Sequence, residues 1–493
     1  MSEAVAAQDI RRVELDRPYY LDLPDPRVCR GWERLKVHPE IARNTLRVAL
    51  PVVFGMVTQS AVNILATVMV GRLPAELANP GQAAIGFSLP IMWLVGGSLS
   101  AIWVGTQAIA ARRNGAGEHE LAGQALTNSF ILGLITSTVL SGLAIWSASW
   151  LLPLLHRDPA SAALGVDYVQ IRLAGVVAMV TTFSLKSFFD GIGRTHYFMT
   201  AAIIMNVLNV VLNALLIFGN PTLGIPRLGV SGAAWASVVS AYIGLFILAS
   251  LALRPSLVRR YRYLRLSNLT PRILREIAVL SFPNAIATIV VMVGFSGFYW
   301  VVGQVNDQVA PPGNPYVAAA SQAVVTLNMV GFMTALAFGS ATASLVGQSL
   351  GARRVYLGER YGWEAAKLWA YVLGAFGLLV FAIPDACVAA INPDPQVIEA
   401  ARDPVRLMAA LQAVIAVAMV FAQTLYGVGD ASFVMVVELV LHLGVMAPGA
   451  YLFGVVLELG LVGVYLGPAI YACALAAATL LRFKRGAWKQ VKI

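Results

Sequence analysis

Ionisable side chains are rare inside the long apolar stretches of this sequence, and four of them form two pairs at helical spacing. Lys186 and Asp190 are four residues apart, and so are Glu438 and His442. Residues four apart lie on one face of a helix, so the members of each pair can meet. Each pair can neutralise its charge in an apolar interior, and each contains a group that can exchange a proton. The sequence thus offers two candidate ion-coupling sites, and the alternative for each is a purely structural contact.

A second polar pattern consists of carboxamides. Asn206, Asn209 and Asn213 occupy positions i, i+3 and i+7 of one apolar stretch, which places them on a single helical face. Amides that face lipid lack hydrogen-bond partners, so we expect this face to point into a bundle and to meet Gln59 and Asn63 of the first apolar stretch. These five residues are candidates for lining a substrate cavity. The alternative is that the amides only hold helices together.

The elements that carry these side chains are long apolar runs. The 493 residues are 58% hydrophobic and 12% charged, with a mean hydropathy of +0.73. Runs of roughly 18 to 25 apolar residues can cross a hydrocarbon core of about 30 Å as helices, and lipid offers no partner to unpaired backbone groups. We therefore expect an all-α integral membrane protein with about twelve transmembrane helices. The expected spans are 46–70, 84–108, 126–150, 168–190, 196–218, 229–253, 278–302, 316–346, 363–391, 404–425, 432–455 and 459–482.

The second half of the chain repeats the first. GTQAIAARRNGA at 105–116 is matched by ATASLVGQSLGA at 341–352, and FFDGIGRTHYF at 188–198 is matched at the same offset by TLYGVGDASFV at 424–434. In so apolar a chain, this duplication predicts two pseudo-symmetric six-helix bundles that face a shared cavity, the architecture of a secondary transporter. The expected divisions are a cytosolic tail at 1–44, a lobe at 45–253, a basic cytoplasmic linker at 254–276, a lobe at 277–482 and a basic cytosolic tail at 483–493.

The placement of Lys and Arg predicts the topology. If the N-terminus is cytoplasmic, 27 of the 35 basic residues fall in cytoplasmic segments and 6 fall on the opposite side. This bias favours an even number of spans with both termini in the cytoplasm. The net charge of +10 is then a topology signal, and the spread of basic residues over loops argues against nucleic-acid binding.

The sequence contains no motif that indicates an enzyme. It contains no G-x-S-x-G, H-E-x-x-H or P-loop motif, and its acids form no dyad within one span. The three cysteines, Cys29, Cys387 and Cys473, have neither disulfide nor metal spacing. Residues 1–44 lack the apolar core of a secretory signal. We expect no metal or organic cofactor, only H⁺ or Na⁺ as a coupling ion.

Several segments resemble the multidrug and toxic compound extrusion (MATE) transporters. NILATVMVGRLP at 63–74 resembles the V-D-T-x-x-V-G stretch of that family, and the segment 188–219 resembles its G-x-G-[DR]-T turn and Asn-rich fifth helix. LGVSGAAWASVVS at 228–240 and AAASQAVVTLN at 318–328 are similar to the sixth and eighth helices. The resemblance implies an antiporter in which two six-helix lobes open a central cavity alternately inward and outward.

The sequence departs from the family at the acids that bind the coupling ion. The resemblance places Ala66 where the family has an aspartate in its first helix, and Asn213 where it has one in its fifth. A third acid, present in the seventh helix of one branch, falls near Val291. A buried acid that is costly to ionise makes a protonation or sodium site. Coupling therefore needs other residues here, or transport proceeds without it.

The sequence favours a MATE-like exporter of small amphipathic or cationic organic compounds, monomeric and in contact with lipid, in a bacterial cytoplasmic membrane. The alternative function is flipping of a lipid-linked saccharide or another lipid, as in relatives of the same multidrug, oligosaccharide-lipid and polysaccharide exporter superfamily. A flippase of this kind would need a strongly cationic cavity, for which Lys186 is the clear candidate.

Overall fold

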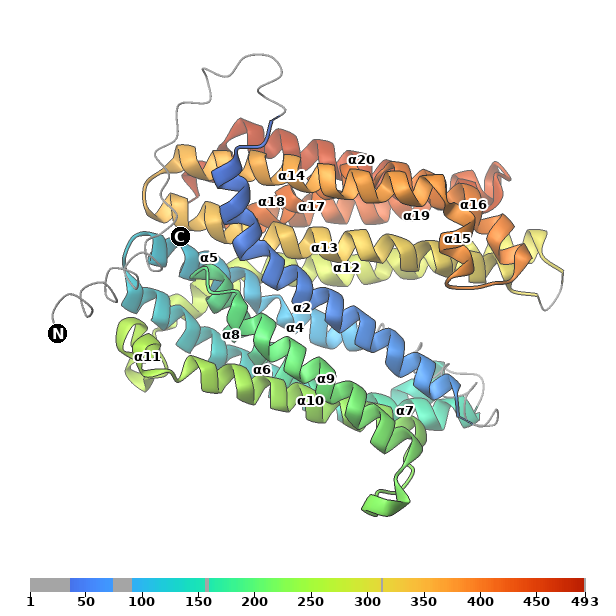
Figure 1. Cartoon of the computed structure of the whole chain (residues 1–493), viewed down its shortest axis with the longest axis horizontal. Coiled ribbons are helices and arrows are strands. Elements are labelled where there is room, and N and C mark those ends of the chain that lie inside the picture. The colour runs from blue at the N-terminus through green and yellow to red at the C-terminus, as the bar shows by residue number, and fades with distance from the viewer. Residues whose placement is uncertain (1–35, 74–90, 156–158, 312–313, 492–493) are drawn as a thin grey trace.

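The computed structural model describes residues 36–73, 91–155, 159–311 and 314–491. Within these ranges the chain is almost wholly helical, and the one β-type pairing among the described residues is an isolated bridge between Asn220 and Ile225. Two groups of long helices lie side by side (Figure 1). The prediction of an all-α membrane protein is confirmed.

The first group of helices, here the N-lobe, is built from the first half of the chain. Within it α5 packs on α6 and α8, and α10 packs on α7 and α9. Its elements are α2 (Pro39–Gly71), η3 (Trp93–Gly97), α4 (Ser98–Ser100), α5 (Ile102–Gly115), α6 (His119–Leu155), α7 (Pro159–Ala174), α8 (Val176–Gly191), α9 (His196–Phe218), η4 (Pro221–Leu223) and α10 (Gly229–Ala252).

The second group, here the C-lobe, is joined to the first by α11 (Pro255–Tyr261) and η5 (Leu266–Asn268). Within it α17 packs on α13, α14 and α20, and α12 packs on α18. Its elements are α12 (Pro271–Val309), α13 (Tyr316–Gly351), α14 (Val355–Ala382), α15 (Pro384–Ala389), α16 (Pro395–Ala410), α17 (Gln412–Gly427), α18 (Ala431–Leu441), η6 (His442–Met446), α19 (Ala447–Tyr451), η7 (Leu452–Val456), α20 (Gly460–Arg485) and η8 (Ala487–Gln490).

The described residues contain ten helices long and apolar enough to cross a membrane, and α16 with α17 forms a further span bent by 52°. The 33-residue helix α2 lies against both groups and completes the bundle. About twelve transmembrane helices fit this arrangement. Pro51 and Pro283 lie inside continuous helices, as membrane helices allow when neighbours satisfy the freed carbonyl.

Several expected boundaries were wrong because apolar composition does not record bends. The second span continues to Gly115, beyond the expected end at 108, and its expected start at 84 lies outside the described residues. The tenth span is broken at Leu411, where α16 and α17 meet at an angle of 52°, whereas the fourth runs through Gly175 as one span at Gly165–Gly191, close to the expected 168–190. The ninth ends at Ala382, before the separate helix α15. Helix α2 begins at Pro39 and α12 at Pro271. The expected divisions of the chain stay predictions, and residues 1–35 lie outside the described ranges.

Helix α2 belongs to both lobes. Its N-terminal half, with Ile41, Val48 and Val52, is buried in the apolar core of the C-lobe. Its C-terminal end, with Val70 and Leu73, is buried in a separate cluster of the N-lobe. The blue helix therefore crosses diagonally from one lobe to the other (Figure 1), and a relative movement of the lobes must bend it or slide it.

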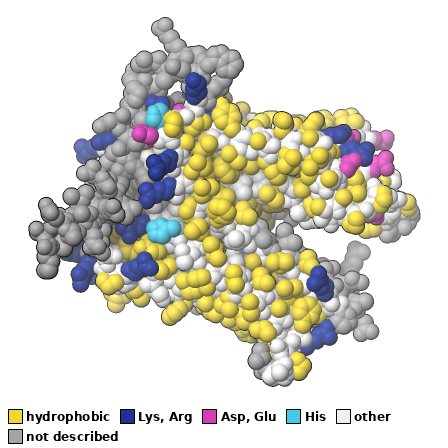
Figure 2. Space-filling view, in the orientation of Figure 1, with side chains coloured by type: hydrophobic (Ala, Val, Ile, Leu, Met, Phe, Trp, Pro, Cys, Tyr) yellow, Lys and Arg dark blue, Asp and Glu magenta, His cyan; other side chains and the backbone are white. Residues whose placement is uncertain are grey.

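The two lobes are closed together at one end and spread at the other. The linker helix α11 and the last described residue, Val491, which accepts a hydrogen bond from Arg112, lie at the closed end (Figure 1). Figure 2 shows a wedge-shaped hollow between the lobes that opens at the opposite end, and it shows most of the visible Lys and Arg side chains at the closed end. The closed end is called the basic end below, and the opposite end the open end. The hollow is called the cleft.

Candidate functional site

Glu438 and His442 meet inside the C-lobe, where α18 passes into η6. His442 Nδ1 lies 3.5 Å from Glu438 Oε2 and 3.0 Å from the Glu438 carbonyl oxygen. The two residues are 9% and 2% exposed. A carboxyl group and an imidazole are thus held in contact in an apolar bundle, where a change of protonation of either one alters the charge of the pair.

The helix around this pair is irregular. His442 begins the π-helix η6, and a second π-helix, η7, follows after the one-turn helix α19 with Pro448. Single π-helical turns often mark functional positions in membrane and soluble helices. The His442 ring packs on the Tyr471 ring at a centroid distance of 4.4 Å. The Tyr426 hydroxyl, buried nearby, has no hydrogen-bond partner among the described residues.

The pair also packs against the seventh long helix, α12. Gly294 of α12 faces the His442 side chain, and a Cβ atom at Gly294 would lie 3.1 Å from His442 Cβ. Gly294 is one turn from Val291, the position where the resemblance places an acid in one branch of the family. The Glu438 carboxyl group on α18 therefore occupies the neighbourhood in which that branch carries its acid on α12.

Lys186 and Asp190 meet at the basic end of α8. Lys186 Nζ lies 2.5 Å from Asp190 Oδ2, and their side chains are 5% and 0% exposed. The ammonium group also lies over the Phe198 ring, 5.2 Å from its centroid. Asp190 Oδ1 has no hydrogen-bond partner among the described residues. The pair neutralises itself, so it adds no net positive charge to the interior of the N-lobe.

The asparagine stripe of α9 points into the N-lobe. Asn206, Asn209 and Asn213 are 4%, 7% and 1% exposed. Asn213 Nδ2 donates to Asn209 Oδ1 at 2.6 Å, and Asn206 Nδ2 donates to Thr58 Oγ1 at 2.8 Å. The Oδ1 atoms of Asn206 and Asn213 have no partner among the described residues. They remain acceptors for a donor that enters the bundle.

The first long helix contributes to this face, though not by the expected residue. The recorded partner of Asn206 on α2 is Thr58, and the adjacent Gln59 is exposed. The side chain of Asn63 lies outside the described set. Ala66, in place of the family aspartate, is half-buried and brings no charge. The polar face of the N-lobe is accordingly built from neutral groups.

Polar contacts between α5 and α13 close the seam between the lobes at the basic end. Gln107 Nε2 donates to the Ser340 carbonyl oxygen and to Ser344 Oγ, both at 2.7 Å. All three residues are at most 3% exposed. Hydrogen bonds in such a dry contact are costly to leave unmade, so separating the lobes requires water to replace them.

Two further contacts across the seam are related by the sequence repeat. Gln348 Nε2 donates to the Gly191 carbonyl oxygen at 2.7 Å. Arg112 Nη2 donates to the Val428 carbonyl oxygen at 3.4 Å, and its Nη1 to the Val491 carbonyl oxygen at 2.5 Å. Arg112 and Gln348 are equivalent positions of the repeat. In each contact, a carbonyl oxygen of the G-x-G turn of the other lobe accepts the hydrogen bond. We call the contacts of Gln348 with Gly191 and of Arg112 with Val428 the reciprocal latch.

Glycines allow the latch helices to touch. A Cβ atom at Gly115 would collide with the backbone of Gln348, and one at Gly351 would collide with the backbone of Arg112. These two glycines are equivalent in the repeat. Absence of a side chain at both positions lets α5 and α13 cross at backbone contact, which is how small residues act at membrane helix crossings.

Removing the latch is expected to open the basic end. Each of the two hydrogen bonds of the latch contributes on the order of 1 kcal/mol, so Arg112→Ala with Gln348→Ala should raise the labelling rate of Ser340→Cys by a water-soluble maleimide about thirtyfold. Arg113→Ala is the matched control, because Arg113 pairs with Glu118 on its own lobe. Equal labelling rates in the double variant and the control would show that the latch does not hold the seam.

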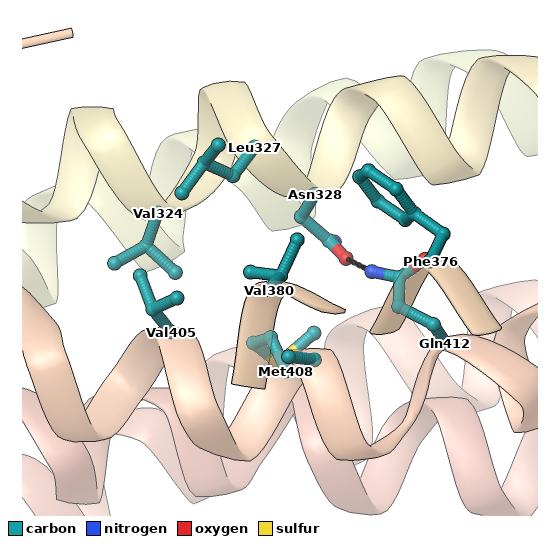
Figure 3. Close-up of a pocket in the computed structure, with 9 residues that line it drawn as sticks. Val324, Leu327, Asn328, Phe376, Val380, Val405, Met408 and Gln412 are labelled. Atoms are coloured by element: carbon teal, nitrogen blue, oxygen red, sulfur yellow. Dashed lines mark hydrogen bonds between the residues drawn. The ribbon is translucent and has the colours of Figure 1, made fainter. Parts of the chain in front are cut away.

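The C-lobe interior has little free space. A cavity of about 10 Å³ lies between α13, α14, α16 and α17 (Figure 3), which is room for a single water. Gln412 Nε2 donates to Asn328 Oδ1 at 2.8 Å, and Gln412 Oε1 has no partner among the described residues. This cavity is too small for an organic substrate. It is lined by Val324, Leu327, Asn328, Phe376, Val380, Val405, Met408, Ala409 and Gln412.

A larger cavity, of about 250 Å³, lies at the open end of the C-lobe, where Glu399 and Asp403 of α16 line it together with Tyr316 of α13. Nearby, the Arg402 guanidinium donates to both carboxylate oxygens of Asp385, at 2.7 and 2.8 Å, and holds the pKa of Asp385 below its usual range. The rim of the open end therefore carries ionised carboxylates.

Sequence reasoning missed the residues of the seam. Gln107, Arg112 and Gln348 lie in the repeated segments 105–116 and 341–352, and the repeat was the one signal that marked them. Their roles depend on the crossing of α5 and α13, which no spacing rule describes. The spacing of four did bring both charged pairs together.

Comparisons with known proteins agree with the fold and the repeat. The MatE family model matches residues 51–215 and 283–452, one stretch in each lobe. The probable multidrug resistance protein NorM of Thermotoga maritima is 25% identical, over 92% of this chain and 94% of that protein. Multidrug resistance protein PmpM of Pseudomonas aeruginosa is 26% identical, with the same shares of each chain.

Solved structures share the fold. One, described as the outward-facing conformation of a multidrug resistance MATE family transporter, is 21% identical, covers 94% of this chain and 99% of its own, and superimposes with a TM-score of 0.82. A transporter from Pyrococcus furiosus, described as having a binding pocket of reverse polarity, is 22% identical, covers the same shares and has the same TM-score. The chain belongs to the MatE family, and it is a multi-pass membrane transporter rather than an enzyme.

Proposed function

We propose that this protein exports small amphipathic or cationic organic compounds across a bacterial cytoplasmic membrane in exchange for H⁺ or Na⁺. Relatives over most of the chain are described as multidrug resistance proteins. The observation that carries the coupling part of the proposal is the buried contact between Glu438 and His442. It lies against α12, near the place where one family branch holds its acid.

The direction of transport follows from charge. The basic end is assigned to the cytoplasm because Lys and Arg are enriched in cytoplasmic loops. The cleft then faces outward, and the seam of Gln107, Ser340 and Ser344 is the closed cytoplasmic gate. The side chains of Glu399 and Asp403, which line the cavity at the open end, favour a cation leaving the cleft, since opposite charges attract.

In the proposed cycle, substrate enters between the lobes from the cytoplasm and contacts the neutral amide face of α9. Rocking of the lobes closes the seam and opens the cleft. Proton or sodium uptake by the Glu438 and His442 pair then favours release and return, because an ion that binds one state more tightly shifts the population towards it. The Lys186 and Asp190 pair, beside the latch residue Gly191, is the second candidate for this coupling.

A lipid-linked saccharide is the less favoured cargo. Lys186, the cationic candidate for binding such a cargo, is neutralised by Asp190 at 2.5 Å. The amide face of the N-lobe carries no charge at Asn206, Asn209 or Asn213. We expect the protein to work as a monomer without a cofactor, because both lobes and the cleft between them come from one chain.

The coupling residue can be tested by transport. Liposomes that contain the purified protein and a fluorescent organic cation are given an inward H⁺ or Na⁺ gradient, each separately. Glu438→Gln should abolish gradient-driven export while retaining exchange of labelled for unlabelled substrate, because the lobes still move. The control is Glu458→Gln, which changes an exposed acid between η7 and α20. This variant should export at the wild-type rate.

Which gradient drives the wild-type protein identifies the ion. Wild-type rates of gradient-driven export by Glu438→Gln would contradict the assignment of this residue. Export by the wild-type protein that is the same with and without either gradient would contradict coupled transport altogether.

A further inference from the structure

A cationic cluster lies at the basic end of the N-lobe, outside the cleft and the seam. Arg47 on α2, His196 at the start of α9 and Arg254 at the end of α10 are all exposed. The guanidinium groups of Arg194, Arg254 and Arg47 all act electrostatically on the His196 ring, and Arg194 has the largest effect of the three. Basic groups from three segments of the N-lobe thus lie together at the edge of the basic end. We call Arg47, His196 and Arg254 the rim cluster.

Local contacts hold the rim cluster together. Thr195 Oγ1 donates to the Val48 carbonyl oxygen at 2.8 Å, which fixes the first turn of α9 beside Arg47. Arg254 Nη1 lies 3.5 Å from the Tyr197 hydroxyl, and its guanidinium lies 5.3 Å from the centroid of the same ring. The arginine is therefore oriented by an aromatic face and keeps most of its N–H donors unused.

No acid of the described chain neutralises Arg47 or Arg254. Every ion pair recorded at this end joins other residues, such as Arg113 with Glu118 and Arg262 with Glu120. Basic groups that gather without a carboxylate repel one another, and the arrangement costs free energy unless an anion binds. Arginine N–H groups can donate paired hydrogen bonds to the oxygen atoms of a phosphate group.

Exposed apolar side chains run from the rim cluster toward the middle of the membrane. On α2, Leu50, Phe54 and Val57 follow Arg47 at i+3, i+7 and i+10, and they are 40%, 56% and 42% exposed. On α9, Ile203 and Val207 follow His196 at i+7 and i+11 and are 41% and 61% exposed. These two helices pack on each other, so their stripes form one apolar surface below the cationic groups.

We propose that the rim cluster binds the phosphate headgroup of an anionic phospholipid, whose acyl chains lie on the stripes of α2 and α9. A phosphate group is the common chemistry of such a lipid and of free inorganic phosphate. The continuous apolar surface below the cluster favours the lipid, because a soluble anion makes no use of it.

The lipid would also act on the transporter. Arg47 lies on the half of α2 that is buried in the C-lobe core, with Val48 and Val52, and His196 and Arg254 belong to the N-lobe. One headgroup therefore bridges the lobes beside the seam. It stabilises the conformation in which the basic end is closed.

The test uses the full chain in nanodiscs and in detergent, with native mass spectrometry to count bound lipids. Phosphatidylglycerol is the probe, phosphatidylcholine the zwitterionic comparison and inorganic phosphate the soluble competitor. Each arginine near an anionic headgroup contributes roughly fivefold to binding, so Arg47→Gln with Arg254→Gln should lower phosphatidylglycerol affinity roughly tenfold or more. Arg265→Gln with Arg275→Gln removes the same charge from exposed positions on the same side and should leave the affinity within about twofold.

Each outcome of this experiment decides the proposal. A specific loss in the rim variant, with no displacement of phosphatidylglycerol by inorganic phosphate, supports the lipid site. Displacement of phosphatidylglycerol by inorganic phosphate would show that the cluster binds a soluble anion. This result would overturn the assignment of a lipid site. Equal losses in the rim variant and the control variant would show that only total charge matters, and they would overturn the site itself.

Discussion

Replacing Lys186 by methionine is expected to lower the free energy of unfolding by about 3–5 kcal/mol. The substitution keeps most of the side-chain volume and its contact with the Phe198 ring. It leaves Asp190, which is 0% exposed, without the ammonium group 2.5 Å away. A buried carboxylate that loses its partner must remain charged in an apolar bundle or take up a proton, and both cost free energy.

A second substitution separates charge from packing. Lys186→Met with Asp190→Asn removes both charges, so the double variant should regain most of the stability lost by the single variant. Unfolding of the purified protein in detergent, followed by tryptophan fluorescence, measures both. If the double variant is no more stable than Lys186→Met alone, the loss comes from packing at position 186, and the ion pair is not what stabilises this end of α8.

Transport distinguishes the two roles of this pair. A structural pair predicts that the double variant exports at the wild-type rate once it folds. A coupling role predicts that it folds and exchanges substrate but no longer responds to the gradient. These outcomes are measured in the same liposomes as Glu438→Gln, so the two candidate sites are compared directly.

The helix ends were predictable where a glycine or another helix-ending residue coincides with the end of an apolar run. The fifth span is expected at 196–218 and α9 covers the same residues, with Gly219 at a φ of 74° directly after its end. The sixth starts at Gly229, which has a φ of 57°. The break at Leu411 was missed, because the apolar run continues through the bend of 52° and hydropathy does not distinguish a bent span from a straight one.

Side-chain pairs within one helix were predictable, and contacts between helices were not. The spacing of four was enough to bring Lys186 to Asp190 and Glu438 to His442. The asparagine face of α9 was expected to meet Gln59 and Asn63 of the first span, and Asn206 instead donates to Thr58, because the rotation of α2 about its axis is set by packing in two lobes at once. The latch of Arg112 and Gln348 depends on how two lobes cross, which only the three-dimensional structure shows.

The central claim is that the seam at the basic end must open in every transport cycle. Ala111 on α5 and Gly347 on α13 face each other across it, and a Cβ atom at Gly347 would lie 2.9 Å from Ala111 Cβ. Two cysteines placed there need only a small adjustment to form a disulfide, for which Cβ atoms are about 3.5–4.5 Å apart. The background is the chain with Cys29, Cys387 and Cys473 replaced by serine.

A control pair carries the same chemistry without crossing the seam. Gly374 on α14 and Ala413 on α17 belong to the C-lobe alone, and a Cβ atom at Gly374 would lie 3.6 Å from Ala413 Cβ. A disulfide there joins two helices that move together. Oxidation of this pair is therefore expected to leave export unchanged.

The decisive measurement is gradient-driven export by Ala111→Cys with Gly347→Cys, before oxidation, after oxidation and after reduction with dithiothreitol. The alternating movement of two lobes predicts that the disulfide stops export and that reduction restores it, with no effect in the control pair. Export by the oxidised protein at the rate of the reduced protein would contradict the claim, because substrate would then cross without separation of the lobes at the basic end.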